Sequence, residues 1–172
     1  MIKSIFKLAV YFVFYVALQV LLLNNIHLFN IATPLLYLYV ILKIPVHISR
    51  SQVIVISFLL GIVMDIFFNT LGMHAAACSL AGMFRNPIMY SFTEKELLEE
   101  ATPSYQTLGV GAFIRYASSL VIIHHVALFC IESISLFDPV FLLIRIFACV
   151  LLTALLIFIV EAFHIEQKRG EA

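Results

Sequence analysis

The sequence contains no tryptophan, only three cysteines, and charged residues at 12% of its 172 positions. Soluble domains carry about 25% charged residues, so the composition argues against a water-soluble globular fold. The formal net charge is zero, which gives no support to nucleic-acid binding. Cys78, Cys130 and Cys149 lie in apolar blocks without ligand-type spacing. We therefore expect packing cysteines, and no disulfide framework.

Catalytic and metal-binding signatures are missing as well. The sequence has no GxSxG, no HExxH and no glycine-rich phosphate loop. His124 and His125 are adjacent, so on a helix they point about 100° apart, which argues against binding one ion together. Asp65 is the only acid well inside an apolar block, which disfavours a pair of catalytic aspartates. We expect no enzymatic activity, no cofactor and no metal.

Long hydrophobic runs dominate what is present. Hydrophobic residues make up 63% of the chain, and the mean hydropathy is +1.10. The apolar blocks are long enough to cross a ~30 Å hydrocarbon layer as helices, and they lack the alternation of barrel strands. The sequence predicts an all-α polytopic membrane protein, with residues 1–172 as a single integral membrane domain and a bundle of six transmembrane helices. The expected spans are about residues 5–23, 33–45, 52–71, 72–92, 108–131 and 139–163.

Two of these spans need comment. In the first, Lys3 and Lys7 precede the apolar stretch of residues 8–23 as in a secretory signal, but no small-x-small cleavage site follows, so we interpret it as a retained span. The second is short and can be either a tilted helix or a re-entrant segment.

Between the fourth and fifth spans, residues 93–103 form a hydrophilic connection. Thr93 and Glu96 match a capping box, which predicts a short helix on the membrane surface.

Basic residues predict the orientation. If six spans alternate, one side of the membrane receives all the Lys and Arg of the connections and chain ends, and the other side receives none; the residues are Lys3, Lys43, Arg50, Lys95, Lys168 and Arg169. The positive-inside rule then places both termini in the cytoplasm. Lys7 and Glu161 lie near the same interface, where we expect them to act as anchors.

Small and polar residues mark the third and fourth spans. Gly61, Asp65, Asn69 and Gly72 fall on one helical stripe. Such a face favours contact with another helix, because glycine allows close approach and the carboxylate needs a donor. The fourth span offers a matching face, and the two should form an antiparallel hairpin. That face contains Ala75, Ser79, Gly82 and Asn86, with Arg85 toward the cytoplasmic end.

Charged groups at membrane depth cost about 2.5–3.5 kcal/mol each, so Asp65 calls for a partner. Arg145 lies at a similar depth in the sixth span and is the preferred candidate, with Arg115 a further candidate nearer the inner side. Two interpretations stay open. Asp65 forms a static ion pair that fixes helix packing, or it acts in binding or as a relay.

The segment from residue 61 to residue 85 resembles the rod shape-determining protein MreD family. The resemblance rests on a glycine followed by three apolar residues and an aspartate, then a leucine–glycine–x–x–alanine turn, then a glycine with a nearby basic residue. The matching positions are Gly61, Asp65, Leu71, Gly72, Ala75, Gly82 and Arg85. The chain length, the six spans and the inside termini agree with that family.

The resemblance implies a non-enzymatic scaffold of the bacterial cell-elongation machinery in the inner membrane. It implies an MreC-like membrane protein as the partner, with links to the actin-like MreB filament and to the glycan polymerase and transpeptidase that extend peptidoglycan. It also implies a fold similar to the substrate-binding subunits of energy-coupling-factor transporters. The alternative is therefore a membrane subunit of a vitamin-type transporter, and an intramembrane enzyme is a third, weaker interpretation.

Overall fold

The computed structural model describes residues 2–25, 32–94, 101–133 and 138–170 of the chain. The regular elements in this part of the chain are all helices. In chain order they are α1 (Ile2–Leu21), a 3-10 turn η1 (Leu23–Asn25), α2 (Leu38–Leu42), α3 (Arg50–Phe68), α4 (Met73–Tyr90), α5 (Tyr105–Leu108), α6 (Val110–Glu132) and α7 (Pro139–Gly170). The predicted all-α membrane class agrees with this content.

Four segments are long and apolar enough to cross a membrane: Ile5–Asn25, Arg50–Phe68, Val110–Glu132 and Pro139–His164. They correspond to the first, third, fifth and sixth expected spans. The helix α4 lies at the place of the fourth span but is less apolar, because it contains polar residues such as His74, Arg85 and Asn86. These polar side chains need protein partners, which the site below supplies.

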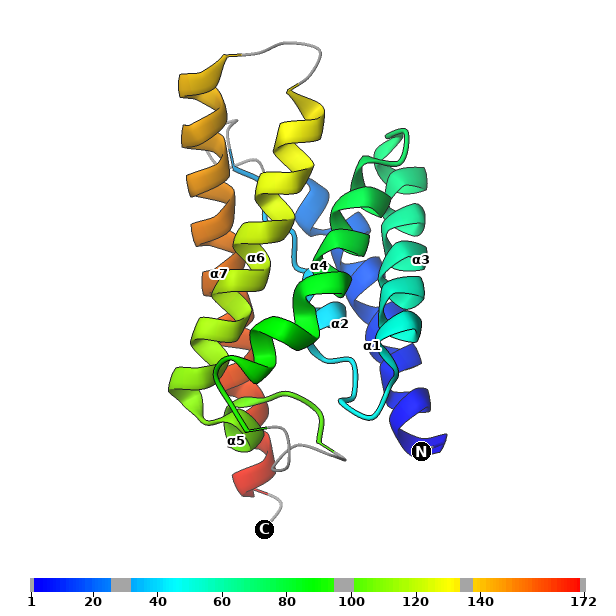
Figure 1. Ribbon diagram of the computed structural model, residues 1–172, viewed down its shortest axis with the longest axis vertical. Coiled ribbons are helices and arrows are strands. Elements are labelled where there is room, and N and C mark those ends of the chain that lie inside the picture. Colours follow the sequence, from blue (N-terminus) through cyan, green and yellow to red (C-terminus); the bar gives the residue numbers. More distant parts are fainter. Residues whose placement is uncertain (1, 26–31, 95–100, 134–137, 171–172) are drawn as a thin grey trace.

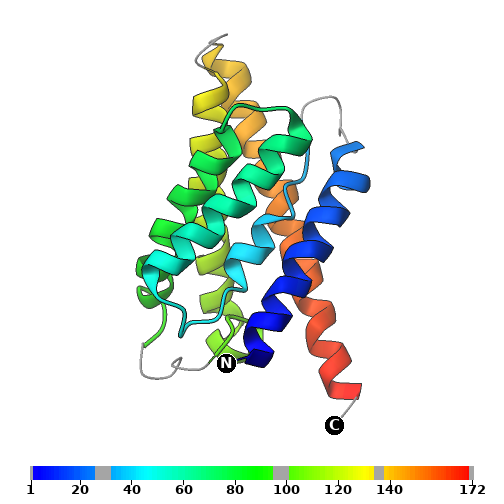
Figure 2. The same cartoon turned by 90° about the vertical axis from the view of Figure 1, so that its right-hand side faces the viewer.

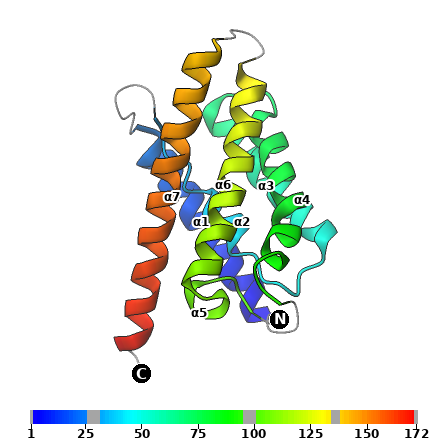
Figure 3. The same cartoon turned by 60° about the vertical axis from the view of Figure 1, so that its left-hand side comes forward.

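The long helices run up and down beside one another (Figure 1). The start of α1 and the end of α7 lie at the same end of the molecule (Figures 1 and 2). α3 and α4 form an antiparallel hairpin, α4 also packs against α6, and α6 lies beside α7 (Figures 1 and 3). Residues 32–46, which we call the central segment, run between these helices, and nearly all of them are buried.

Local sequence explains the ends of α3. Ser49 accepts a hydrogen bond from the backbone N–H of Gln52, and the Gln52 side chain accepts one from the Ser49 N–H, which is a capping box. At the other end, Asn69 adopts the left-handed conformation with φ 54°, which terminates the helix. Gly72 follows with φ 77° and starts α4, so the turn between the helices is tight.

The second expected span differs from the structure. Only residues 38–42 of the expected 33–45 are helical, and residues 33–35 have no regular structure. The expected surface helix in the 93–103 connection falls mainly on residues 95–100, outside the described residues. The remaining spans are shifted by a few residues at their ends, and α7 continues beyond residue 163 to Gly170.

Candidate functional site

Most of the buried polar side chains form hydrogen bonds or an ion pair with the central segment. Backbone outside a regular helix cannot be exposed to lipid, because its N–H and C=O groups would lack partners. In this chain it is enclosed instead, and residues 34–46 are all buried. Its short helix α2 leaves donors and acceptors unpaired at both ends, and side chains from four other helices bond them.

Gln19 on α1 and Thr153 on α7 bond the beginning of the segment. The Gln19 amide donates to the Pro34 carbonyl at 2.8 Å, and its oxygen accepts from the Leu36 N–H at 2.7 Å. The Thr153 hydroxyl accepts from the Leu35 N–H at 3.0 Å. Both polar side chains are fully buried. Their hydrogen bonds offset the desolvation of backbone groups that α2 cannot pair itself.

Arg85 on α4 and Tyr116 on α6 bond the other end. The Arg85 guanidinium is fully buried and donates to the carbonyls of Ile41, at 3.1 Å, and Ile44. The Tyr116 hydroxyl donates to the Leu42 carbonyl at 3.2 Å. A cation at the carbonyl end of a helix is also favoured by the helix dipole. Arg85 therefore contacts the interior of the protein and presents no surface to a partner.

A buried ion pair fixes the end of the central segment to α7. Lys43 Nζ lies 2.7 Å from Glu161 Oε2 and also donates to the Pro103 carbonyl at 2.8 Å. The Glu161 carboxylate accepts further hydrogen bonds from the Tyr39 hydroxyl, at 2.5 Å, and from the Tyr105 N–H, at 3.2 Å. Glu161 is 1% exposed. Its expected role as an interfacial anchor is therefore wrong, because the carboxylate points inward to these donors.

This pair also affects the neighbouring helix α5. Ser104 caps α5 by accepting from the Thr107 N–H, and Tyr105 follows at its first position. The Tyr105 hydroxyl approaches the Phe158 carbonyl of α7 at 3.4 Å. Burial, followed by the nearby Glu161 carboxylate, raises the pKa of Tyr105. The Tyr105 N–H bonds the Glu161 carboxylate and the neutral Tyr105 hydroxyl bonds the Phe158 carbonyl. Residues 101–108 are thus attached to α7 at two points.

Asp65 caps the helix that follows its own. The carboxylate of Asp65, on α3, accepts from the backbone N–H of His74 at 3.0 Å and of Ala75 at 2.9 Å. It also accepts from the Thr70 hydroxyl at 2.5 Å. These amides belong to the first turn of α4, where unpaired N–H groups and the helix dipole both favour an anion. The N-cap residue Gly72 has no side chain to do this.

Two glycines allow α3 and α4 to approach closely. A Cβ on Gly61 would lie 2.5 Å from the His74 carbonyl oxygen and 2.6 Å from the Ala75 nitrogen. A Cβ on Gly82 would lie 2.5 Å from the Ser57 hydroxyl oxygen. The structure therefore places the expected residues Gly61, Ala75 and Gly82 at the hairpin interface. This close approach brings the first turn of α4 within reach of Asp65.

The other expected contact residues have different positions. Asn69 and Gly72 form the turn, where their positive φ angles matter, and both are exposed. Ser79 bonds the Ala75 carbonyl of its own helix at 2.7 Å, and Asn86 accepts from the Arg85 guanidinium at 2.7 Å. These two polar groups are satisfied locally within α4.

The expected ion pair between Asp65 and Arg145 is not formed. Arg145 pairs with Glu132 at 2.8 Å, and Asp65 has the three donors given above. Arg115, the other candidate, is exposed, and its guanidinium lies over the Phe92 ring at 5.3 Å. Three hydrogen bonds from the turn and from α4 satisfy the Asp65 carboxylate without a cation.

His74, His124 and His125 are buried, and they form hydrogen bonds near the start of the central segment. Tyr37 Oη lies 2.8 Å from His74 Nδ1 and 3.0 Å from His124 Nε2. His125 Nε2 lies instead 3.2 Å from the Thr153 hydroxyl, so the two adjacent histidines engage different partners. Among the described residues, no three His, Cys, Asp or Glu side chains are arranged to hold a metal ion. Sequence reasoning missed this cluster because its members come from α4, α6 and the central segment.

Comparison with known proteins adds no identification. The chain matches no family model, no curated protein and no solved structure.

Proposed function

We propose that this chain is a non-enzymatic scaffold of the bacterial cell-elongation machinery in the inner membrane, and that it binds an MreC-like membrane protein. The proposal extends to the links that the resemblance implies, with the MreB filament and with the glycan polymerase and transpeptidase of peptidoglycan synthesis. It depends on the resemblance of residues 61–85 to the MreD family.

One observation supports this proposal above others. The residues that carry the resemblance include Gly61, Asp65, Ala75 and Gly82, and they meet at the α3–α4 interface. There they have a shared structural purpose, because the two glycines bring the helices together and Asp65 caps α4. A motif whose members cooperate in one hairpin is a more specific resemblance than the same residues scattered over the chain.

The proposed topology has six crossings, with both termini in the cytoplasm. On this view α1, the central segment, α3, α4, α6 and α7 each cross once. The second crossing is short-helical and enclosed, and the fourth is the polar α4. In support, α1 begins and α7 ends at one end of the molecule (Figures 1 and 2). With six crossings, the Lys and Arg of the connections and chain ends would all belong to the side of the two termini, as the positive-inside rule requires.

The packing of α3 against α4 limits the surfaces to which a partner helix can bind. The small-residue faces of α3 and α4 are already used against each other, so they are not available to a partner helix. A partner would instead contact apolar side chains that face lipid, such as Val55, Leu59 and Ile66 on α3, which are all more than half exposed. The cytoplasmic connections would contact the filament.

Co-purification tests the proposal. The full chain, tagged and extracted in mild detergent from rod-shaped bacteria, should carry an MreC-like protein with it. A matched control is another tagged polytopic membrane protein of the same cells, which should not. Absence of the MreC-like protein from the wild-type eluate, with the chain itself folded, would reject the scaffold.

The competing proposal is a transporter subunit with the fold of energy-coupling-factor substrate-binding proteins. It needs a pocket for a vitamin-sized ligand. A pocket of about 180 Å³ lies between α6, α7 and the α3–α4 turn, with Arg145, Glu132 and His74 among its lining residues. Small-molecule sites commonly measure about 300–1,000 Å³. This pocket is smaller, but an adjacent pocket that shares Glu132 and Arg145 measures about 330 Å³, which is within that range. The preference for the scaffold therefore depends on the resemblance to the MreD family and not on pocket size.

A further inference from the structure

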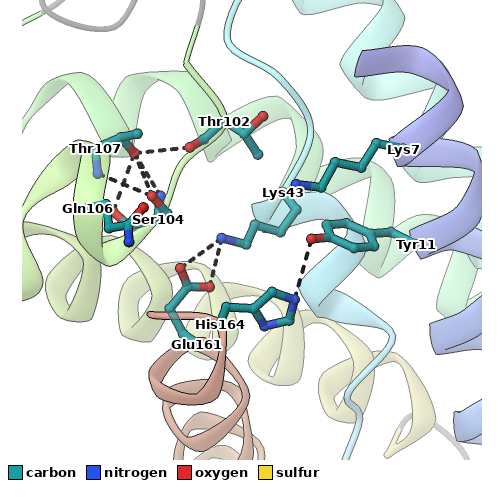
Figure 4. A pocket seen from close by; sticks show the side chains of 9 residues that line it. All are labelled: Lys7, Tyr11, Lys43, Thr102, Ser104, Gln106, Thr107, Glu161 and His164. Atoms are coloured by element: carbon teal, nitrogen blue, oxygen red, sulfur yellow. Dashed lines mark hydrogen bonds and ion pairs between the residues drawn. The ribbon is translucent and has the colours of Figure 1, made fainter. Parts of the chain in front are cut away.

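A second pocket, of about 200 Å³, lies at the end of the molecule where α1 begins. It is formed by α1, α7, the end of the central segment and the 102–107 connection (Figure 4). Although 63% of the chain is hydrophobic, each lining side chain has a polar group. These residues are Lys7, Tyr11, Lys43, Thr102, Ser104, Gln106, Thr107, Glu161 and His164. Polar groups converge on this pocket from every lining side chain, which favours a polar ligand.

The charges in the pocket favour an anion. Lys43 and Glu161 neutralise each other, and both Glu161 oxygens are engaged by Lys43, Tyr39 and Tyr105. Lys7 remains as the surplus positive charge. Its ammonium lies over the Tyr11 ring at 5.5 Å, and no carboxylate of the described residues is within ion-pair distance of it. Figure 4 shows the Lys7 side chain reaching from α1 toward the segment that carries Lys43.

The position of the pocket selects the kind of anion. In the sequence, Lys3 and Ser4 precede the apolar stretch of α1, and Glu166, Gln167 and Lys168 follow the apolar stretch of α7. Lys7 and His164 therefore lie where both helices leave the hydrocarbon layer, at the level of lipid headgroups. Next to them in sequence, Phe6 and Phe163 are 71% and 65% exposed, which provides apolar surface for acyl chains beside a polar pocket.

We propose that this pocket binds the phosphate group of one anionic phospholipid from the leaflet at that end of the molecule. The Lys7 ammonium donates to the phosphate oxygens, and neutral donors of the pocket, such as the Thr102 hydroxyl, complete the contact. The acyl chains lie along the outer surfaces of α1 and α7. The Lys43–Glu161 pair forms the inner wall and carries no net charge.

The test uses the full chain in detergent, titrated separately with phosphatidylglycerol and with phosphatidylethanolamine, with bound lipid counted by native mass spectrometry. We expect one phosphatidylglycerol to bind in preference to phosphatidylethanolamine. Lys7→Gln should weaken that binding about fivefold, the effect of one basic residue near a membrane surface. Thr102→Val should weaken it by a smaller factor.

Arg50→Gln is the matched control. Arg50 is an exposed cation at the start of α3, at the same end of the molecule but outside the pocket lining. Equal weakening by Arg50→Gln and Lys7→Gln would show a diffuse surface effect and overturn the proposal. An excess of inorganic phosphate should leave phosphatidylglycerol bound, because the acyl contacts also contribute. Displacement by inorganic phosphate would overturn the lipid as the source of the phosphate group.

Discussion

Lys43 Nζ and Glu161 Oε2 lie 2.7 Å apart, and neither side chain is more than 5% exposed. The two residues are separated by 118 positions in the chain. One ends α2 in the middle of the molecule, and the other belongs to the last long helix. Their contact, together with the hydrogen bonds of Gln19, Thr153, Arg85 and Tyr116, holds a largely non-helical segment between the long helices.

Removing either Lys43 or Glu161 should lower the free energy of unfolding. Lys43→Met leaves the Glu161 carboxylate buried without its cation, which typically destabilises by about 3–5 kcal/mol. Equilibrium unfolding in mixed detergent micelles measures the loss. The control is Glu132→Gln, which breaks the Arg145–Glu132 pair. The side chains of that pair are 33% and 38% exposed, so its loss should lower the free energy of unfolding by about 0–1 kcal/mol. Similar losses for the two variants would contradict the buried role of Lys43.

The double variant Lys43→Met/Glu161→Gln should be more stable than the sum of its single changes implies. Neither side chain then leaves an unpaired charge in the interior, and coupling between residues in contact is commonly about 0.5–3 kcal/mol. The same unfolding assay gives the coupling energy. A strictly additive result would mean that the two charges do not stabilise each other.

Asp65 should behave as a helix cap. Asp65→Ala removes the acceptor for two amides of α4 and should destabilise by about 1–2 kcal/mol, while Asp65→Asn keeps one acceptor oxygen and should lose less. Unfolding of both variants in micelles measures the difference. Arg145→Gln provides the control, because Arg145 is not the partner of Asp65. The two changes should add within about 0.5 kcal/mol, and strong coupling between them would restore the ion pair expected from the sequence.

Glycine substitutions should separate close packing from helix propensity. Gly61→Ala places a methyl group 2.5 Å from the His74 carbonyl oxygen, so the helices must move apart, at a cost of about 1–3 kcal/mol. Gly111→Ala, in α6, has nothing within 4 Å of the added carbon and should be neutral or stabilising by about 0.5–1 kcal/mol. Thermal unfolding temperatures compare the two, and a reversed order would contradict the α3–α4 packing.

Arg85 should tolerate lysine poorly. The guanidinium bonds two separate carbonyls, of Ile41 and Ile44, and a lysine ammonium cannot reproduce that fork. Loss of one hydrogen bond from a charged group corresponds to about 1.5–3 kcal/mol in unfolding free energy. Arg115→Lys changes an exposed arginine and should stay within about 0.5 kcal/mol of the wild type. Equal effects at the two positions would argue against the buried role of Arg85.

The sequence predicts the long apolar helices because a membrane span is a local property. Twenty apolar residues in a row identify a span wherever they lie, so the first, third, fifth and sixth expected spans match apolar helices of the structure. The second expected span is helical only over residues 38–42, for a non-local reason. Residues 33–37 do not need helical hydrogen bonds, because Gln19 and Thr153 supply partners from elsewhere in the chain.

The buried ion pair shows what sequence reasoning missed. The sequence predicts Lys43 in a connection and Glu161 at the membrane surface, since each lies near the end of an apolar block. A signal was available, because the predicted topology put both residues on the same side of the membrane. The same reasoning from depth that suggested Asp65 and Arg145 as partners would also have suggested Lys43 and Glu161. Depth alone does not decide pairing, because backbone amides compete with cations for a carboxylate.

The proposed role in cell elongation is tested most directly by cell shape. Depletion of the chain from a rod-shaped bacterium that encodes it, followed by microscopy of cell width and length, should give rounded cells. Expression of the wild-type chain should restore rods, as should Asp138→Asn, which changes an exposed acid at the start of α7. Cells that keep their rod shape and growth after complete depletion would contradict the scaffold proposal.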